Sequence, residues 1–303
     1  MYFIDHSFLI VYGEEAGLRK AFGLRRAFAR HLEHPGVVTV SPRGRNGAAM
    51  SDRLNSKIII VTGGTSGMGE ATVKRLAGEG ATVVIGARDK ARGEAVAAEA
   101  SADGGTVVFV PTDVTREEDV ARLVDFTVKE FGALHGAFNN AGGGNSQGSI
   151  REVDAPFWET VIALNLTSVF YSLKHEIPAI IASGGGAIVN NASVVGAAGD
   201  PSAVAYSAAK HGVVGLTRST ALDAAKDGVR VNALLTGLVN TPLWQGFTAS
   251  NPEAANSILS QQPTGRSADV SEIAAFTAFL LSDESRFISG AALAIDGALT
   301  AGY

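Results

Sequence analysis

From residue 57 onward, short apolar runs alternate with longer segments whose apolar residues recur at helical spacing. The first of these runs, KIIIV at 57–61, is a short continuous β-branched run that ends at a glycine cluster, which is typical of a strand buried on both faces. The longer segments have the amphipathic pattern of helices that pack on a sheet. The predicted strands are 57–61, 82–86, 106–110, 134–138, 187–191, 229–234 and 291–295, and the predicted helices are 70–79, 89–100, 116–131, 156–183, 203–226 and 269–282.

This alternation predicts a parallel sheet with right-handed crossovers and helices on both faces, hence a three-layer, doubly wound α/β domain. Ligands bind such sheets beyond the carboxyl ends of the strands, where the polar clusters of this chain fall. Hydrophobic residues make up 46% of the 303, which is ample for a core, and the absence of Cys excludes disulfides, thiolate metal sites and cysteine nucleophiles. A net charge of −5 and the lack of an apolar run of roughly 20 residues led us to expect a cytoplasmic protein that binds neither nucleic acid nor membranes, and no metal.

Residues 1–49 differ from the rest in charge. They carry seven Lys/Arg and four Asp/Glu, a net charge of +3, whereas residues 50–303 carry 18 and 26, a net charge of −8. We interpret the first segment as a poorly ordered extension or an over-long start upstream of Met50, followed by one domain at 50–303. The alternatives are an interaction arm and a targeting peptide, which the arginines favour and Glu14, Glu15 and Glu33 oppose.

A glycine-rich cluster, TGGTSGMG at residues 62–69, lies directly between the first strand and the first helix. Glycine allows a tight turn and close approach of the backbone to a pyrophosphate, and the helix that follows offers free N–H groups to that anion. The spacing differs from G-x-G-x-x-G, so an ordinary turn is the alternative. The expected cofactor contacts are Gly63, Thr65, Ser66, Gly67, Met68 and Gly69.

The end of the second strand bears on which dinucleotide is bound. Folds that bind NAD usually place Asp or Glu there, on the ribose 2′-hydroxyl. Here the strand ends Gly86-Ala87 and Arg88 follows, with Asp89 as the expected N-cap of the next helix. A guanidinium can bind a 2′-phosphate through two hydrogen bonds, so we predict NADP as the preferred cofactor with NAD possible, unless Arg88 is a solvated surface residue.

Tyr206 and Lys210 are four residues apart in one predicted helix, so they share a face. A nearby ammonium stabilises phenolate and lowers the pKa of a tyrosine, which would make Tyr206 an acid–base group near neutral pH. Ser193 follows the strand at 187–191, where its hydroxyl could hold a substrate oxygen.

Together these motifs resemble those of the short-chain dehydrogenase/reductase family, in its ordinary-length form. The matching features are the loop at 62–69, Asn-Asn-Ala-Gly at 139–142, Ser193, Tyr-Ser-Ala-Ala-Lys at 206–210 and Arg-Val-Asn-Ala at 230–233, and the likeness covers residues 57–303. It implies a seven-stranded Rossmann sheet, a homodimer or homotetramer, and NAD(P)-dependent interconversion of a secondary alcohol and a carbonyl compound.

The resemblance also implies roles for individual residues. Tyr206 would be the acid–base group, Lys210 would lower its pKa and bind the nicotinamide ribose, Ser193 would orient the substrate oxygen, and Asn165 would hold a relay water. The further cofactor contacts it implies are Asp113 and Val114 at the adenine, Asn140, Ala141 and Gly142 near the ribose, and Val239 and Thr241 at the carboxamide.

Two departures from the family pattern stand out. Thr236-Gly237 replaces the usual Pro-Gly, which led us to expect a looser loop, and Ala192 replaces the first serine of a pair. Residues 243–263 stand where the family has a mobile lid, and Trp244 and Phe247 suggest an apolar wall; the alternative is simple packing of Trp244 against the domain. The alcohol or ketone substrate is undetermined, and a steroid, a sugar, an acyl thioester and a small cyclic alcohol are the open alternatives. The alternatives are same-fold chemistry (epimerase, dehydratase or enoyl reductase) and a redox-silent dinucleotide-binding module, which would have lost Tyr206 or Lys210.

Overall fold

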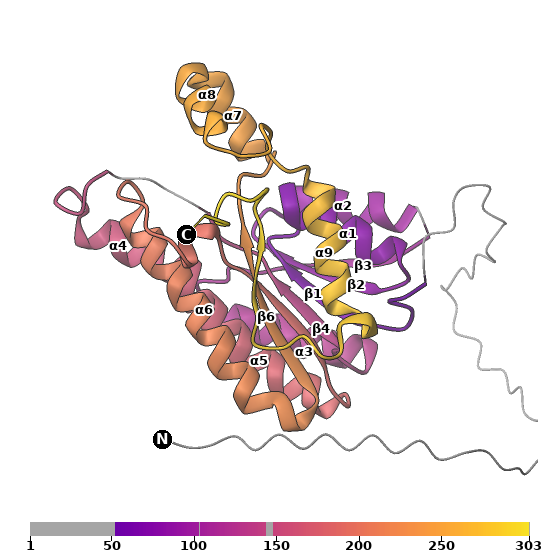
Figure 1. Cartoon of the computed structure of the whole chain (residues 1–303). Helices are drawn as coiled ribbons and strands as arrows, with labels where there is room; N and C mark the ends of the chain where they lie inside the picture. The colour runs from indigo at the N-terminus through magenta and orange to yellow at the C-terminus, as the bar shows by residue number, and fades with distance from the viewer. Residues whose placement is uncertain (1–51, 103, 144–147, 303) are drawn as a thin grey trace, which may run out of the picture. The chain divides into compact units, whose positions relative to one another are not determined.

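The protein is described by a computed structural model for residues 52–102, 104–143 and 148–302, so the predictions for residues 1–49 lie outside the described residues. Seven parallel strands form one sheet in the order β3-β2-β1-β4-β5-β6-β7 (Figure 1). The strand order reverses between the neighbouring strands β1 and β4: β2 and β3 extend the sheet on one side of β1, and β4 to β7 extend it on the other. The strands are β1 (Ile58–Thr62), β2 (Thr82–Ala87), β3 (Thr106–Pro111), β4 (Gly136–Asn139), β5 (Gly186–Asn191), β6 (Val229–Thr236) and β7 (Ala292–Ile295).

Helices cover both faces of this sheet. Figure 1 shows α1, α2 and α9 on one face and α3, α5 and α6 on the other, which confirms the three-layer, doubly wound α/β prediction. The helices are α1 (Gly67–Gly78), α2 (Lys90–Ala102), α3 (Glu117–Phe131), α4 (Ala155–Ile162), α5 (Ser168–Ala182), α6 (Val204–Ala224), α7 (Pro242–Ser250), α8 (Pro252–Ser260) and α9 (Val270–Leu281).

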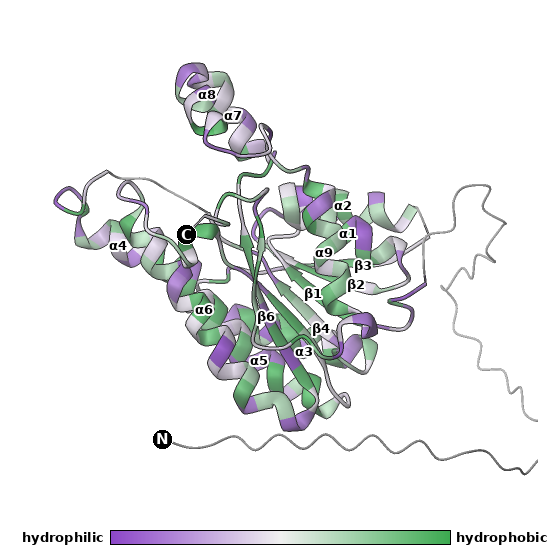
Figure 2. Ribbon diagram, viewed as in Figure 1, coloured by the Kyte–Doolittle hydropathy of each residue, from purple (hydrophilic) through white to green (hydrophobic). Residues whose placement is uncertain are grey.

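The strands are buried because successive side chains enter different cores. Ile59 and Val61 of β1 pack with α1 and α9, whereas Ile60 between them packs with α3, α5 and α6. All three are at most 1% exposed. The central strands are hydrophobic along most of their length, whereas the helices carry both hydrophobic and hydrophilic residues (Figure 2).

The structure divides two segments that the sequence pattern left undivided. The helix predicted at 156–183 is interrupted by a π-helical turn at Ala163–Thr167, which separates α4 from α5. The segment after β6 forms two helices, α7 and α8, because Pro242 and Pro252 each start a new helix. In Figure 1 this helix pair stands beyond the carboxyl ends of the strands.

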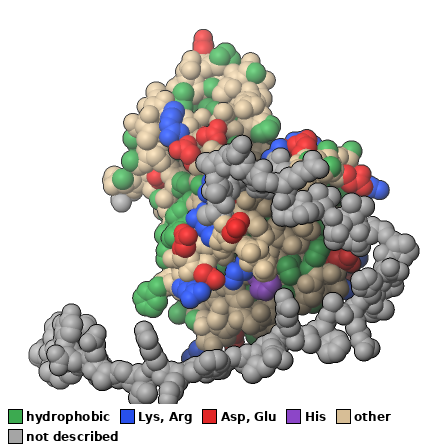
Figure 3. Space-filling view, turned by 90° about the vertical axis from the view of Figure 1, so that its right-hand side faces the viewer, with side chains coloured by type: hydrophobic (Ala, Val, Ile, Leu, Met, Phe, Trp, Pro, Cys, Tyr) green, Lys and Arg blue, Asp and Glu red, His purple; other side chains and the backbone are tan. Residues whose placement is uncertain are grey.

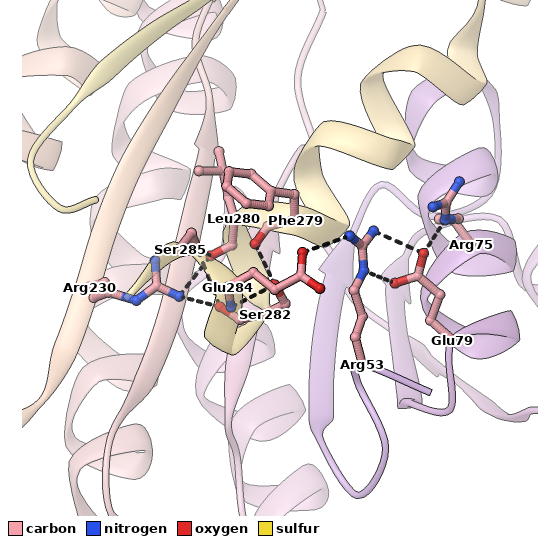
Figure 4. Close-up of polar contacts among 9 residues, drawn as sticks. All are labelled: Arg53, Arg75, Glu79, Arg230, Phe279, Leu280, Ser282, Glu284 and Ser285. Carbon is pink, nitrogen blue, oxygen red and sulfur yellow. Dashed lines mark hydrogen bonds and ion pairs between the residues drawn. The ribbon is translucent and has the colours of Figure 1, made fainter. Parts of the chain in front are cut away.

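The amino-terminal end of β1 is anchored by residues that precede the predicted first strand. Leu54 is fully buried, and its N–H donates to the carbonyl of Glu79 at 3.1 Å. Arg53 donates to the buried carboxylate of Glu79 at 2.9 Å and to Glu284 at 3.4 Å, and Arg75 also pairs with Glu79 (Figure 4). The ion pair with Glu79 raises the pKa of Arg53. The described part of the domain therefore depends on residues before 57, although the sheet itself begins at Ile58.

The surface carries charges of both signs. Acidic and basic side chains lie next to one another over the face in Figure 3. Surface ion pairs of the described residues include those of Lys74 with Glu70 and Glu99. No described helix is long and apolar enough to cross a membrane. The described residues also contain no cluster of His, Asp and Glu side chains that could hold a metal ion.

Candidate active site

The glycine loop lies between β1 and α1, at the carboxyl end of β1. Gly63 and Gly67 have φ values of +67° and +53°, a conformation that residues with a Cβ rarely adopt. A Cβ on Gly69 would lie 2.2 Å from the carbonyl oxygen of Gly63, so only glycine fits there. Asn140 donates from Nδ2 to the Gly63 carbonyl at 3.3 Å and thus joins the loop to the end of β4.

Arg88 is exposed beyond the end of β2 and lines the same cleft as the glycine loop. Asp89 is the N-cap of α2 as predicted, since its Oδ1 accepts from the N–H of Arg92 at 3.0 Å. Arg92 itself was missed by the sequence analysis: its Nε donates to the Thr65 carbonyl at 3.3 Å and its Nη2 pairs with Glu70 at 2.6 Å. A guanidinium from the first turn of α2 thus reaches the glycine loop, and the sequence held no signal for it beyond a basic residue early in the helix.

Asp113 and Val114 lie just after β3, on the cleft wall. The Asp113 carboxylate accepts hydrogen bonds from the N–H and the hydroxyl of Thr115 at 3.0 and 2.7 Å. The N–H of Asp113 donates to Asp119 at 3.0 Å, and this bond lowers the pKa of Asp119. These bonds fix the turn at the far end of the cleft from Tyr206.

Tyr206, Lys210 and Ser193 converge at the other end of the cleft. The Lys210 ammonium is buried, donates to the Asn191 carbonyl at 2.7 Å and lies 5.4 Å from the centre of the Tyr206 ring. Ser193 begins the short turn after β5 and accepts from the N–H of Val195 at 3.4 Å, and it lies close enough to Tyr206 to lower the pKa of that phenol. The end of β5 and the first turns of α6 therefore bring together the three residues that the sequence analysis selected.

Asn165 lies in the π-helical turn, which the pattern of apolar residues did not predict. Its Nδ2 donates to the Val161 carbonyl at 3.1 Å, and its Oδ1 accepts from the N–H of Gly143 at 3.0 Å. A Cβ on Gly142 would lie 2.8 Å from Asn165 Oδ1 and 3.7 Å from Lys210 Nζ. The extra residue in the turn thus brings a buried amide to the edge of the Lys210 site.

Burial dominates the electrostatics of this group. It raises the pKa of Tyr206 to about 12, against a smaller lowering effect of the Ser193 hydrogen bond, and it lowers the pKa of Lys210 to about 8. In the protein alone, the pKa of Tyr206 moves in the opposite direction to the one expected from a neighbouring lysine, because burial of the phenolate is the largest cause of its shift. Tyr206 is therefore a protonated phenol at neutral pH.

A single cleft of about 480 Å³ connects most of the predicted site residues. Asn165, Ser193, Gly69 and Val239 are not among the residues that line it. The predicted residues that line the cleft are Gly63, Thr65, Ser66, Gly67, Met68, Arg88, Asp113, Val114, Asn140, Ala141, Gly142, Tyr206, Lys210 and Thr241.

The loop after β6 is held by its backbone, contrary to the expectation of a looser loop. The N–H of Asn240 donates to the Ala268 carbonyl, and the N–H of Ala268 donates to the Leu238 carbonyl, both at 2.8 Å. Val239, between these bonds, is 7% exposed. These bridges constrain the loop in place of the missing proline.

Helix α7 brings an apolar edge to the cleft. Thr241 caps the helix by accepting from the N–H of Trp244 at 3.3 Å, and the rings of Trp244 and Phe247 are stacked 5.5 Å apart. Leu243 lines the cleft and is 69% exposed. Leu243, Trp244 and Phe247 thus form an apolar, uncharged stretch of α7, of which Leu243 lines the cleft that Tyr206 and Lys210 also line.

Comparison with known proteins gives consistent matches. The profile of a family described as enoyl-(acyl carrier protein) reductase matches residues 63–300. A cyclohexanol dehydrogenase of Acinetobacter sp. (strain SE19) is 40% identical over 83% of this chain and 98% of its own, and a cis-4-hydroxycyclohexanecarboxylate dehydrogenase of Sinomonas cyclohexanicum is 42% identical over 83% and 100%. The crystal structure of levodione reductase superimposes with a TM-score of 0.79 at 35% identity, covering 82% of this chain and 99% of that one.

Proposed function

Because the chain belongs to the short-chain dehydrogenase/reductase family and interconverts a secondary alcohol and a carbonyl compound with NAD(P), we propose that it acts on uncharged alicyclic substrates, with Tyr206 as acid–base group and NADP(H) preferred. The observation that carries this proposal is the convergence of Tyr206, Lys210 and Ser193 at one end of a cleft whose other end is the glycine loop.

The residues of the cleft fit a dinucleotide. The close approach of Gly69 to Gly63 leaves room for backbone contact with a pyrophosphate, and the first turn of α1 presents its N–H groups there. The bound cofactor supplies the hydride donor or acceptor. Asn140, Ala141 and Gly142 would flank its ribose, Lys210 would donate to the ribose hydroxyls, and Val239 and Thr241 would meet the carboxamide.

Tyr206 supplies the proton in this proposal. A phenol with a pKa near 12 is fully protonated at neutral pH, so it can donate to the oxygen of a carbonyl substrate while Ser193 binds the same oxygen. In alcohol oxidation the phenolate must form, and the charge of Lys210 favours it. Asn165, held by Gly143 and Val161, would keep a water next to Lys210 for proton exchange with solvent.

The preference for NADP(H) rests on two guanidinium groups. Arg88 forms no hydrogen bond or ion pair with the other described residues and is free to bind a 2′-phosphate. Arg92 is already paired with Glu70, so its contribution to phosphate binding is smaller. The end of β2, where folds that bind NAD place an acidic residue on the ribose 2′-hydroxyl, is occupied by Ala87.

The substrate class rests on the apolar edge formed by Leu243, Trp244 and Phe247. The name of the cyclohexanol dehydrogenase agrees with an uncharged ring, whereas that of the cis-4-hydroxycyclohexanecarboxylate dehydrogenase agrees with the ring but not with the absence of charge. The test is a panel of cyclohexanol, its carboxylated analogue, 2-hexanol and an enoyl thioester, followed by NAD(P)H absorbance. We expect kcat/KM for cyclohexanol to exceed that for either other alcohol by about tenfold or more, and no enoyl reduction. A preference for the carboxylate or reduction of the enoyl thioester would contradict the assignment.

We also propose a homodimer or homotetramer formed through α5 and α6. A shallow groove between these helices is lined by small and apolar residues, and Phe170 beside it is 45% exposed. Light scattering of the wild type should give two or four chains per particle. Phe170→Asp, which places a charge in the proposed contact, should shift the mass toward one chain. An unchanged mass would place the contact elsewhere.

A further inference from the structure

One carboxyl group lies deep in the domain and takes no part in the function described above. Glu176 is on the buried stripe of α5, between Leu173 and Ile180, and is 1% exposed. Its Oε2 accepts one hydrogen bond, from Asn139 Nδ2 at 2.9 Å. A buried carboxylate is stabilised by a cation or by several donors, and Glu176 has one neutral amide.

The charged side chains on the elements around Glu176 form no ion pair with it among the described residues. On its own helix, Lys174 and His175 turn to Glu117 of α3 at 2.6 and 3.1 Å. Asp125 and Lys129 of α3 line the outer groove between α3 and α5. Lys210 of α6 donates to the Asn191 carbonyl. The strands contribute only uncharged groups, Asn139 of β4 and Asn190 of β5.

Asn139 links Glu176 to a buried chain of hydrogen bonds across two strands. Its Nδ2 also donates to Asn190 Oδ1 at 3.0 Å, and Asn190 Nδ2 donates to Thr217 Oγ1 of α6 at 2.9 Å. Asn139 Oδ1 is buried without a partner among the described residues. A neutral glutamic acid carries an O–H donor, which is the kind of group that this orphaned acceptor lacks.

This chain of bonds lies directly beneath the active site. Asn139 and Asn190 pair across the sheet, and the next residues, Asn140 and Asn191, are the ones that bond the glycine loop and Lys210. Thr217 is seven residues after Lys210, two helical turns along the same face of α6. The bonds from α5 to α6 therefore fix the spacing of β4, β5 and α6 on which the contact of Lys210 with Asn191 depends.

We propose that Glu176 is a positioning residue that acts as an uncharged acid: its O–H donates to the otherwise unpartnered Asn139 Oδ1 and helps to hold β4, β5 and α6 in place beneath Lys210, and its ionisation near neutral pH removes this donor and releases that contact. Burial raises the pKa of Glu176 to about 7, against a smaller lowering effect of the Asn139 bond, so the release falls within reach of ordinary assays. The folded chain favours the acid form, so stability is lost as the pH rises from 4.5 to about 7 and stays constant above it.

The test compares Glu176→Gln, which keeps the shape and both kinds of hydrogen-bonding group but cannot ionise, with Glu176→Leu, which removes them. At one pH unit above a pKa of about 7, one carboxyl in eleven is protonated. The ratio of kcat/KM between Glu176→Gln and the wild type should thus be near 1 at pH 6 and about 10 at pH 8. Glu176→Leu should lose turnover at both values, and Glu94→Gln, an exposed carboxyl on α2, should behave as wild type.

Two further readouts do not depend on the substrate being correctly chosen. The melting temperature of Glu176→Gln should exceed that of the wild type by an amount that grows between pH 5 and 7. The infrared C=O stretch of a protonated carboxylic acid should be present in the wild type at pH 6 and absent from this variant. A ratio of kcat/KM that does not change with pH, or full activity of Glu176→Leu, would overturn the proposal, as would the absence of the infrared band.

Discussion

The contacts of Arg53 and Leu54 with Glu79, which anchor the start of β1, allow a direct test of where the folded domain begins. Two shortened chains differ only by these residues and their neighbours: one starts at Met50 and the other at Lys57. We propose that residues 1–49 form an extension that the domain does not need, so the chain from Met50 should fold, assemble and turn over like the full chain. The chain from Lys57 retains all seven strands but loses the anchor.

The magnitude follows from what each residue touches. Loss of a fully buried leucine such as Leu54 costs about 2–5 kcal/mol. Loss of Arg53 leaves the carboxylate of Glu79, 1% exposed, with Arg75 as its remaining cation among the described residues. Breaking a buried ion pair costs about 3–5 kcal/mol, which we reduce to about 1–3 because Arg53 is 18% exposed and Arg75 remains. The total of about 3–8 kcal/mol is comparable with the whole stability of many domains, about 5–15 kcal/mol.

Urea unfolding followed by circular dichroism would measure the difference. The chain from Met50 should have the midpoint of the full chain, and Leu54→Ala within it should lower the free energy of unfolding by about 2–5 kcal/mol. The chain from Lys57 should be unfolded or close to its midpoint without urea. Equal stability of the two shortened chains would refute the anchor, and an inactive or insoluble chain from Met50 would refute the proposal for residues 1–49.

Two further predictions concern the cofactor. Arg88→Ala should raise the KM for NADP(H) by about ten- to a hundred-fold, which is the value of one charge-assisted contact. The KM for NAD(H) should stay nearly unchanged. An equal rise in the KM for NADP(H) and for NAD(H) would remove the support that Arg88 gives to an NADP preference. Gly69→Ala would place its Cβ 2.2 Å from the Gly63 carbonyl, so the folded variant should lose at least tenfold in cofactor affinity by fluorescence titration, and unchanged affinity would contradict the position of the loop.

The sequence was sufficient where one local pattern determines the structure. Short apolar runs between helical patterns placed the strands to within two residues. A parallel sheet brings the carboxyl ends of β1, β4 and β5 together, which places Gly63, Asn140 and Asn191 side by side. The pair of Tyr206 and Lys210 was predictable because both lie on one face of a regular helix.

The sequence was insufficient where a contact joins elements far apart in the chain. Arg53 meets Glu79 across 26 residues, and Glu176 meets Asn139 across 37, with no signal at either position besides a polar residue in an apolar setting. The π-helical turn at Ala163–Thr167 also has no glycine or proline to mark it. Its position is set by packing of the long helix on the domain, which overrides the local preference for regular helix.

The proton step is the central claim, and Tyr206→Phe tests it most directly because the ring stays while the titrating hydroxyl is removed. Single-turnover reduction of a cyclic ketone, started with saturating NADPH, measures the chemical step apart from product release. We predict a rate about 10²–10⁴-fold below wild type, with an unchanged dissociation constant for NADPH and an unchanged melting temperature. A variant that keeps a near-normal rate would contradict the assignment of Tyr206 as the acid–base group.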